Sequence, residues 1–193
     1  MGKILLIVDP QRDFMDEGRL PVKGSEERMR NLASYLSTLS YDEYDKIIVT
    51  LDWHPYNHCS FKENGGMWNT HCVEFTEGAL VVEPLLYNLK QWGKQGKLIT
   101  VTKGDKIDKE EYSIVQNTSS FGKIRQYLDE ATQIDVCGVV GTVCVKNTLN
   151  DLLCVYQDRL NVLLDYTAQF SAEDEISFIE WLGERNIKCQ TNH

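Results

Sequence analysis

A chain of 193 residues is long enough to bury a sizeable hydrophobic core, and we expect one domain spanning residues 1–193. Its 42% hydrophobic and 25% charged residues are ordinary values for a globular protein in water. Twenty basic against 29 acidic residues give a net charge of −9 at pH 7. This balance argues against general binding to nucleic acids or to anionic membranes, because both need a basic surface.

The start of the chain and its cysteines indicate the compartment. The apolar run at residues 3–8 is too short for a signal peptide or a membrane span, and no cleavage site follows it, so we expect a cytoplasmic protein. The six cysteines are dispersed and form no C-x-x-C pair. In a reducing compartment such cysteines are expected to be free thiols.

Apolar runs predict a series of buried strands, beginning with residues 3–8, which end before Asp9-Pro10. Further strands are expected at residues 46–51, 98–102, 134–140 and 161–164, with a short last strand at 187–190. A long loop at residues 53–80 is rich in His, Asn, Gly and Cys, and loops of this length in compact domains are usually functional.

Helical periodicity fills most of the intervals between these strands. Helices are expected at residues 28–39, 83–92, 121–128, 143–156 and 171–185. In the last of them Ser171 is the expected cap, and Ile176, Ile179 and Leu182 are the expected inner face. Strands alternating with helices predict an α/β fold, a three-layer αβα sandwich around a mostly parallel sheet of about five or six strands.

Four chemically active side chains stand at or just past the ends of predicted strands: Asp9, Asp52, Lys103 and Cys144. In open α/β sheets, sites form beyond the carboxyl ends of the strands. A carboxylate, a lysine and a thiol suit acyl transfer, because the lysine stabilises both anions and the carboxylate can take the proton of the thiol.

Cys144 is placed where the strand at 134–140 passes into the helix at 143–156. Backbone N–H groups and the helix dipole at such a position favour the reactive thiolate. The alternative interpretation is that Cys144 is a small buried core residue, as free cysteines often are.

The loop at residues 53–80, with the residue before it, carries a candidate metal site. Asp52 and His54 lie two apart in an extended segment and point the same way, and His71 can supply a third ligand. Three nitrogen or oxygen ligands with open positions are typical of a catalytic Zn²⁺ or Fe²⁺ site. His58 is a candidate fourth ligand, an outer hydrogen-bond partner or a brace of the loop. The alternative is a set of histidines that only hydrogen-bond to backbone.

Five motifs follow one another along the chain. They are V-D-P-Q-R-D-F at 8–14, D-W-H-P-Y-N-H-C-S-F at 52–61, W-N-T-H-C-V at 68–73, K-G at 103–104 followed by E-Y-S at 111–113, and G-V-V-G-T-V-C-V at 138–145. Each motif alone is weak evidence, but in this order and at these spacings they resemble the isochorismatase-like cysteine hydrolases and, within them, the nicotinamidases, which hydrolyse nicotinamide or pyrazinamide. The D-x-H metal motif separates nicotinamidases from metal-free relatives.

The resemblance implies catalytic roles at the matching positions. Asp9 would be the general base and later acid, Lys103 its charged partner and Cys144 the nucleophile that forms a thioester. A cis peptide bond would join Val139 to Val140, and the N–H groups of Val140 and Cys144 would form the oxyanion hole.

The resemblance also implies the ligands and the activity. Asp52, His54 and His71 would hold one divalent metal ion, zinc first, with iron or manganese as alternatives. Phe14, Trp68 and Tyr112 would wall a slot for a flat pyridine ring, although Phe14 could equally be core. The implied reaction converts nicotinamide, or a similar aromatic amide, to the acid and ammonia in NAD salvage, and family members occur both as monomers and as homo-oligomers.

Two departures from the family pattern leave the substrate open. The family often has Thr-Asp where this chain has Gly141-Thr142, and nicotinamidases often have Pro where this chain has Asn69. The alternatives are a sister hydrolase for another small amide, a catalytically silent module that binds metal or ligand, and a redox-sensing thiol protein. The metal, the physiological substrate and the oligomeric state stay open at this point.

Overall fold

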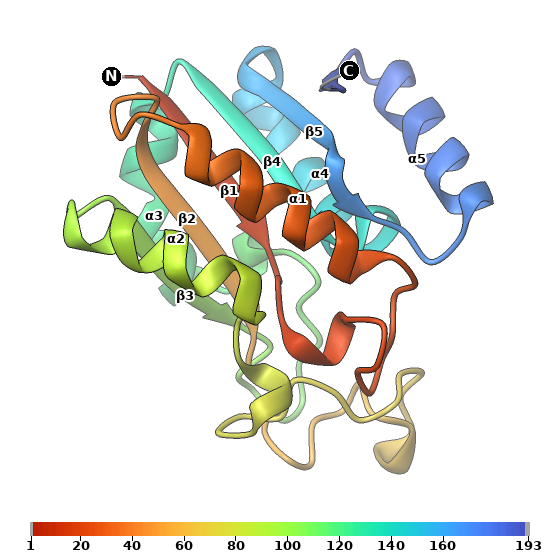
Figure 1. Ribbon diagram of the computed structural model, residues 1–193. Coiled ribbons are helices and arrows are strands. Elements are labelled where there is room, and N and C mark those ends of the chain that lie inside the picture. The colour runs from red at the N-terminus through yellow and green to blue at the C-terminus, as the bar shows by residue number, and fades with distance from the viewer. Residues whose placement is uncertain (1, 192–193) are drawn as a thin grey trace.

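The computed structural model describes residues 2–191, and its centre is one sheet of six parallel strands (Figure 1). The strand order is β3-β2-β1-β4-β5-β6, so the chain builds outward from β1 in one direction and then from β4 in the other. The strands are β1 (Lys3–Val8), β2 (Tyr44–Asp52), β3 (Leu98–Lys103), β4 (Gln133–Val139), β5 (Leu160–Ala168) and β6 (Lys188–Gln190).

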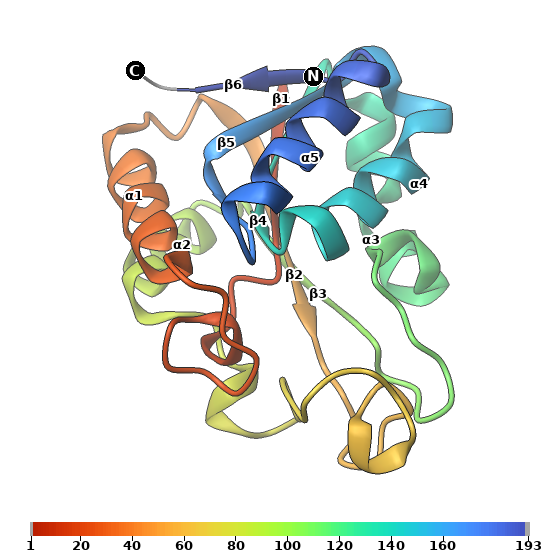
Figure 2. The ribbon, with the colours of Figure 1, turned by 90° about the vertical axis from the view of Figure 1, so that its right-hand side faces the viewer.

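Helices cover both faces of this sheet, as the views in Figures 1 and 2 show. One face packs against α1 (Ser25–Thr38) and α2 (Glu83–Lys94). The other face packs against α3 (Thr118–Glu130), α4 (Lys146–Tyr156) and α5 (Ala172–Glu184). The three-layer αβα sandwich around a parallel sheet is therefore confirmed.

The core divides into two apolar layers because strand side chains alternate between the two faces. Leu5 and Ile7 of β1 belong to the layer under α1 and α2, whereas Ile4 and Leu6 belong to the layer under α3, α4 and α5. These four side chains are almost completely buried. The continuous apolar run of β1 follows directly from burial on both faces.

Strand β5 differs from the expected strand at residues 161–164, because it runs on to Ala168 and contains Asp165 instead of ending before it. Its pairing with β4 is interrupted: Val136 pairs with Val162 and Gly138 with Thr167, so two steps on β4 match five steps on β5. The extra residues form a bulge, which local hydrophobicity does not reveal.

Helix α5 turns a different face to the core from the expected one. Ser171 caps the helix as expected, with its Oγ accepting a hydrogen bond from the N–H of Asp174. Ile176 and Ile179, however, are 58% and 41% exposed, so the prediction that they face inward is wrong, while Leu182 is buried as expected. Phe178 and Trp181 are buried with Leu182, since this stripe removes more apolar area from water than the two isoleucines would.

Within residues 2–191, no helix combines the length and the apolar character needed to cross a membrane. All six cysteines are free, as expected.

Candidate active site

The four strand-end residues come together at one edge of the sheet. Asp52 and Lys103 are the last residues of β2 and β3 and pair in register, and Asp9 directly follows β1. Cys144 lies in a turn of π-helix that follows β4, Gly141–Val145, which we call the Cys144 turn. Since β1 and β4 are the neighbours at which the chain reverses its direction across the sheet, Asp9 and Cys144 flank the crevice where open α/β sheets bind ligands.

Lys103 connects the two carboxylates with the thiol. Its Nζ lies 2.8 Å from Oδ2 of Asp9, makes a short hydrogen bond with Oδ1 of Asp52, and lies 3.6 Å from Sγ of Cys144. Lys103 and Asp9 are completely buried. Within residues 2–191, Oδ2 of Asp9 accepts no well-directed hydrogen bond, so one of its lone pairs is open to a proton from the nearby thiol.

Burial and charge set the protonation states of this group. Burial raises the pKa of Asp9, and the positive charge of Lys103 only partly offsets it. At Asp52 burial acts the same way, but Lys103 and the two neighbouring histidines outweigh it, so the pKa of Asp52 is lowered. Burial would lower the pKa of Lys103, yet the two carboxylates hold it well above its ordinary value.

The thiol differs from the expectation for a helix start. Burial raises the pKa of Cys144 well above its ordinary value, and Lys103 offsets only part of this effect. The resting side chain is therefore a thiol, and it needs a base to become a nucleophile. The peptide bond between Val139 and Val140 is cis, as the resemblance implied.

Asp52, His54 and His71 form a compact buried group whose ligand atoms all lie within 4.8 Å of one another. Nε2 of His54 and Nε2 of His71 lie 3.6 and 3.9 Å from Oδ2 of Asp52. In both histidines Nδ1 is engaged by a backbone carbonyl, of Gly104 at 3.0 Å and of Asn69 at 2.7 Å. With Nδ1–H donating to these carbonyls, both Nε2 atoms face the Asp52 carboxylate, and the three groups together are the donor set of a divalent metal ion.

The two histidines differ in charge. Burial lowers the pKa of His71 to about 4, so its imidazole is neutral and ready to ligate. Burial also acts to lower the pKa of His54, but the Asp52 carboxylate outweighs it and the pKa is raised. Ligation at His54 therefore displaces a proton, as metal binding commonly does.

His58 stacks on His54, with ring centroids 4.2 Å apart. Its Nδ1 lies 2.7 Å from Oγ of Ser60 and its Nε2 lies 3.0 Å from the carbonyl oxygen of Lys109. Both ring nitrogens therefore have protein partners, which favours the loop brace among the three roles considered for this residue.

Gly104 lies against the His54 ring and hydrogen-bonds to it. It has a φ of +66°, and a Cβ there would lie 2.4 Å from Cε1 of the ring. Its N–H donates to Oε2 of the buried Glu111 at 2.9 Å, while its carbonyl accepts from His54. A side chain at this position would both strain the backbone and displace the ring of His54, a candidate metal ligand.

An aromatic cavity lies next to Cys144. Phe14, Trp68 and Tyr112, the three expected wall residues, all line it, and Nε1–H of Trp68 donates to the Tyr112 hydroxyl at 3.0 Å. Phe170 stacks beside Trp68 with ring centroids 6.3 Å apart. The cavity has a volume of only about 20 Å³, so these side chains must move to admit a ring.

Comparisons with known proteins agree with this geometry, although no protein-family model matches the sequence. The structure of the pyrazinamidase of Pyrococcus horikoshii in complex with zinc superposes with a TM-score of 0.81 and 31% identity, over 98% of this chain and 99% of that one. The chain belongs to the nicotinamidase and pyrazinamidase family.

Other members of the family support this assignment. The nicotinamidase of Saccharomyces cerevisiae is 29% identical over 203 residues, covering 90% of this chain and 91% of that protein. The yeast nicotinamidase bound to the inhibitor nicotinaldehyde superposes with a TM-score of 0.84 at 26% identity, over 98% of this chain and all of that one. These matches extend over the fold and are not limited to the motif segments.

Some residues at this family site gave no signal in the sequence. Leu20, Val143 and Phe170 line the cavity, and Gln169 contacts the Cys144 turn. Phe170 and Gln169 reach the site because β5 is longer than its apolar run, and nothing local marks that extension. Glu110 also lines the cavity, and only its position beside the E-Y-S segment could have drawn attention to it.

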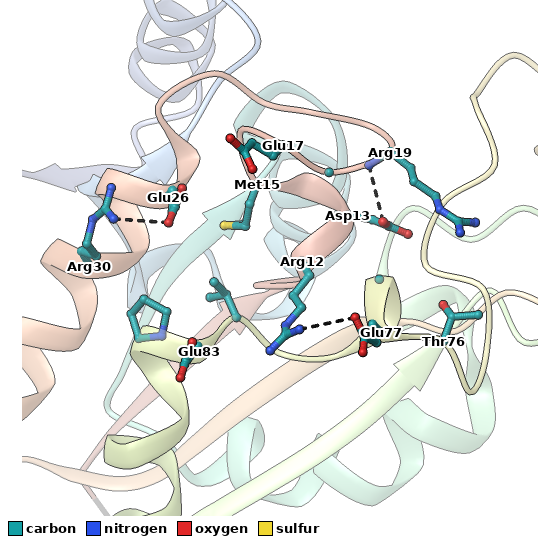
Figure 3. Close-up of a pocket in the computed structure, with 14 residues that line it drawn as sticks. Arg12, Asp13, Met15, Glu17, Arg19, Glu26, Arg30, Thr76, Glu77 and Glu83 are labelled. Carbon is teal, nitrogen blue, oxygen red and sulfur yellow. Dashed lines mark hydrogen bonds and ion pairs between the residues drawn. The ribbon is translucent and has the colours of Figure 1, made fainter.

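A second, larger hollow of about 910 Å³ lies away from Cys144 (Figure 3). It is lined by Arg12 and the starts of α1 and α2. Two pairs of its charges contact each other, Arg30 with Glu26 at 3.2 Å and Arg12 with Glu77 at 3.9 Å, and all four side chains are partly or largely exposed to solvent. Volume alone therefore does not mark the reactive site, and the buried charged groups at the strand ends do.

Proposed function

We propose that the protein is an amidohydrolase that converts nicotinamide to nicotinic acid and ammonia through a thioester on Cys144. The observation that carries the proposal is the contact of Lys103 with Asp9, Asp52 and Cys144 at one buried point beside three converging metal-ligand side chains. The named activities of the family members support the substrate.

In the first half of the reaction, Oδ2 of Asp9 takes the proton of the Cys144 thiol, and the sulfur attacks the carboxamide carbon. The raised pKa of Asp9 makes its carboxylate a stronger base, which it needs because burial also raises the pKa of the Cys144 thiol. The N–H groups of Val140 and Cys144 would stabilise the oxyanion that forms. Asp9 then protonates the departing nitrogen, ammonia leaves, and a thioester remains.

In the second half, Asp9 takes a proton from water, and the resulting hydroxide attacks the thioester carbon. The C–S bond breaks, nicotinic acid leaves, and the proton returns to sulfur. Lys103 remains charged throughout, because the two carboxylates hold its pKa high, and it stabilises whichever of Asp9 and Cys144 is the anion.

Asp52, His54 and His71 would hold a divalent metal ion, zinc or alternatively iron or manganese, beside the aromatic cavity. Such an ion would supply Lewis acidity beside the cavity, where a pyridine nitrogen or an ordered water could be bound. Phe14, Trp68 and Tyr112 would clamp the flat ring on the two sides of the cavity.

A sister amidase with another small aromatic amide as substrate is the second candidate. The Gly141-Thr142 departure lies in the Cys144 turn, and the cavity is narrowed by Phe170. The Asn69 departure bears less on the site, because only its backbone carbonyl contacts His71 and its side chain bonds the exposed Lys62.

The deciding experiment measures ammonia and nicotinic acid formed from nicotinamide before chelation, after chelation and after metal is restored. The proposal expects release that chelation stops and that zinc, iron or manganese restores. Absence of release from the metal-loaded protein would reject nicotinamide and favour the sister amidase.

Cys144→Ala tests the nucleophile. We expect this change to abolish turnover, because no other group can form the thioester. Cys154→Ala, at an exposed cysteine of α4, is the matched control and should retain full activity. Substantial turnover by Cys144→Ala would remove Cys144 from the mechanism.

The cytoplasmic location, the absence of nucleic-acid and membrane partners, and assembly into a homo-oligomer remain predictions from the sequence.

A further inference from the structure

We propose that Gln169 is a positioning residue for Cys144: its side-chain carbonyl fixes the Cys144 turn from the end of β5. The proposal rests on the proposed function in naming Cys144 as the nucleophile. Gln169 itself need not touch the substrate or the reacting atoms, because it acts on the backbone of the turn that carries Cys144.

The bulge in β5 delivers Gln169 to this place. Where two steps on β4 match five on β5, the end of β5 pairs again with β4, so that Ala168 lies beside Val139. Gln169 follows Ala168 directly, and it is 92% buried, since only 8% of it is exposed. A polar side chain buried to this extent beside the turn that carries Cys144 must satisfy its hydrogen bonds there.

Oε1 of Gln169 accepts a hydrogen bond from the backbone N–H of Thr142 at 2.9 Å. Thr142 is two residues before Cys144, in the first turn, where backbone N–H groups lack helical partners. The N–H groups of Val143 and Val145 are both satisfied within the turn, by the carbonyl of Val140 at 3.0 and 3.1 Å. The hydrogen bond from Thr142 to Gln169 instead connects the Cys144 turn, which follows β4, to the end of β5.

Gly141 makes this contact sterically possible. A Cβ on Gly141 would lie 1.7 Å from Nε2 and 2.4 Å from Cδ of Gln169, so the amide group occupies the space that a side chain would need. The φ of Gly141 is not positive, so an L-residue could adopt its backbone conformation. A side chain at position 141 would therefore displace the Gln169 amide, and we treat Gly141 and Gln169 as one unit.

The function of the unit follows from the geometry of the thiol. Sγ of Cys144 must stay close to Lys103, now at 3.6 Å, and to the open lone pair of Asp9. Nucleophilic attack is sensitive to displacements of about 1 Å, which can cost roughly a hundredfold in rate. A turn held from both β4 and β5 keeps the sulfur within that tolerance.

The first test replaces Gln169 with a side chain of similar length that has no acceptor. For Gln169→Met we expect kcat to fall roughly tenfold to a hundredfold. KM should change less than about twofold, because the ring-binding walls are intact. Gln126→Met, on the exposed surface of α3, is the matched control and should match the wild type. An unchanged kcat in folded Gln169→Met would overturn the proposal.

The second test uses the contact between Gly141 and Gln169 as a double-mutant cycle. Gly141→Ala alone should lower kcat, because the new Cβ displaces the amide from Thr142. In the Gln169→Ala background the space beside Gly141 is open, so adding Gly141→Ala should lower kcat almost no further. If the fold-losses in kcat of the two single variants multiply in the double variant, Gly141 acts independently of Gln169, and the proposal is overturned.

Two readouts do not depend on nicotinamide turnover. Hydrogen exchange at the Thr142 amide should be faster in Gln169→Met and in Gly141→Ala than in the wild type. The rate at which iodoacetamide modifies Cys144, followed by peptide mass spectrometry, should shift in both variants and show the same non-additivity. If wild-type protein releases no ammonia, the proposed function fails while these rates still decide the positioning role: coupled shifts support it, and unchanged rates refute it.

Discussion

At the scale of single residues, the site depends on how one buried cation is shared. Lys103 faces two carboxylates and a thiol, and burial acts on all four groups. The shared charge lowers the pKa of Asp52, while the pKa of Asp9 remains raised. This division leaves Asp52 as a permanent anion for metal binding and Asp9 as a group that can take and return a proton.

The hydroxyl of Thr50 contacts Asp9, the proposed base, so changing Thr50 should change the pKa of Asp9. It donates to Oδ1 of Asp9 at 2.7 Å and so lowers the pKa of that carboxyl. Because Asp9 must be unprotonated to accept the thiol proton, activity should be lost as pH falls through its pKa. In Thr50→Val that pKa rises, so the acid limb of the kcat/KM profile for nicotinamide should move to higher pH. Thr100→Val, at an exposed position of β3, should leave the limb in place.

An acid limb that stays unchanged or moves to lower pH in Thr50→Val would show that a group other than Asp9 controls it.

At the scale of elements, two glycines with the same positive φ allow a matched test of the candidate metal site. Gly104 and Gly96 both have a φ of +66°, but a Cβ meets the His54 ring at Gly104 and no atom within 4 Å at Gly96. Both alanine variants place an L-residue at a positive φ, which costs of order 1 kcal/mol at either position. Only Gly104→Ala should therefore lower the zinc affinity, measured by competition with a chromogenic chelator. Equal zinc affinities in the two variants would contradict the role of Gly104.

The orientation of α5 gives a second prediction at this scale. Leu182 is fully buried, and Ile176 is 58% exposed. Leu182→Ala should lower the free energy of unfolding by about 2–5 kcal/mol, because it leaves a cavity in the core. Ile176→Ala should change it by no more than about 0.5 kcal/mol. Urea unfolding measures both values. A larger loss of unfolding free energy in Ile176→Ala than in Leu182→Ala would show that Ile176 faces the core, as the sequence predicted.

At the scale of the whole molecule, the three candidate metal ligands anchor the long loop at residues 53–80 to the end of β2. Asp52 ends a central strand, whereas His54 and His71 lie in the long loop that follows it. An ion that binds only the folded arrangement stabilises the entire fold, by about 2.7 kcal/mol at a free concentration of 100 Kd. For a chain of this size we expect roughly 5–10 °C in Tm.

Thermal unfolding with zinc and with a chelator checks this expectation, and His71→Ala should remove most of the shift. A Tm that does not respond to zinc would contradict a structural link through the metal.

The sequence by itself determined the α/β class, the order of the helices and strands, and the identity of the strand-end residues. It could do so because buried parallel strands and amphipathic helices carry local periodicity, and because chain order places strand ends at a common edge. The motif segments further named Asp9, Lys103 and Cys144 for chemistry and Asp52, His54 and His71 for metal, and the fold brings each group together.

Only the tertiary structure decided which face of α5 is buried, because two apolar stripes compete on that helix and packing against the sheet selects the larger one. It alone decided that burial keeps Cys144 a thiol, since desolvation depends on neighbours from several strands. It alone brought Gln169 and Phe170 to the site, because the bulge in β5 depends on its register with β4, and register is a relation between strands that no single segment encodes.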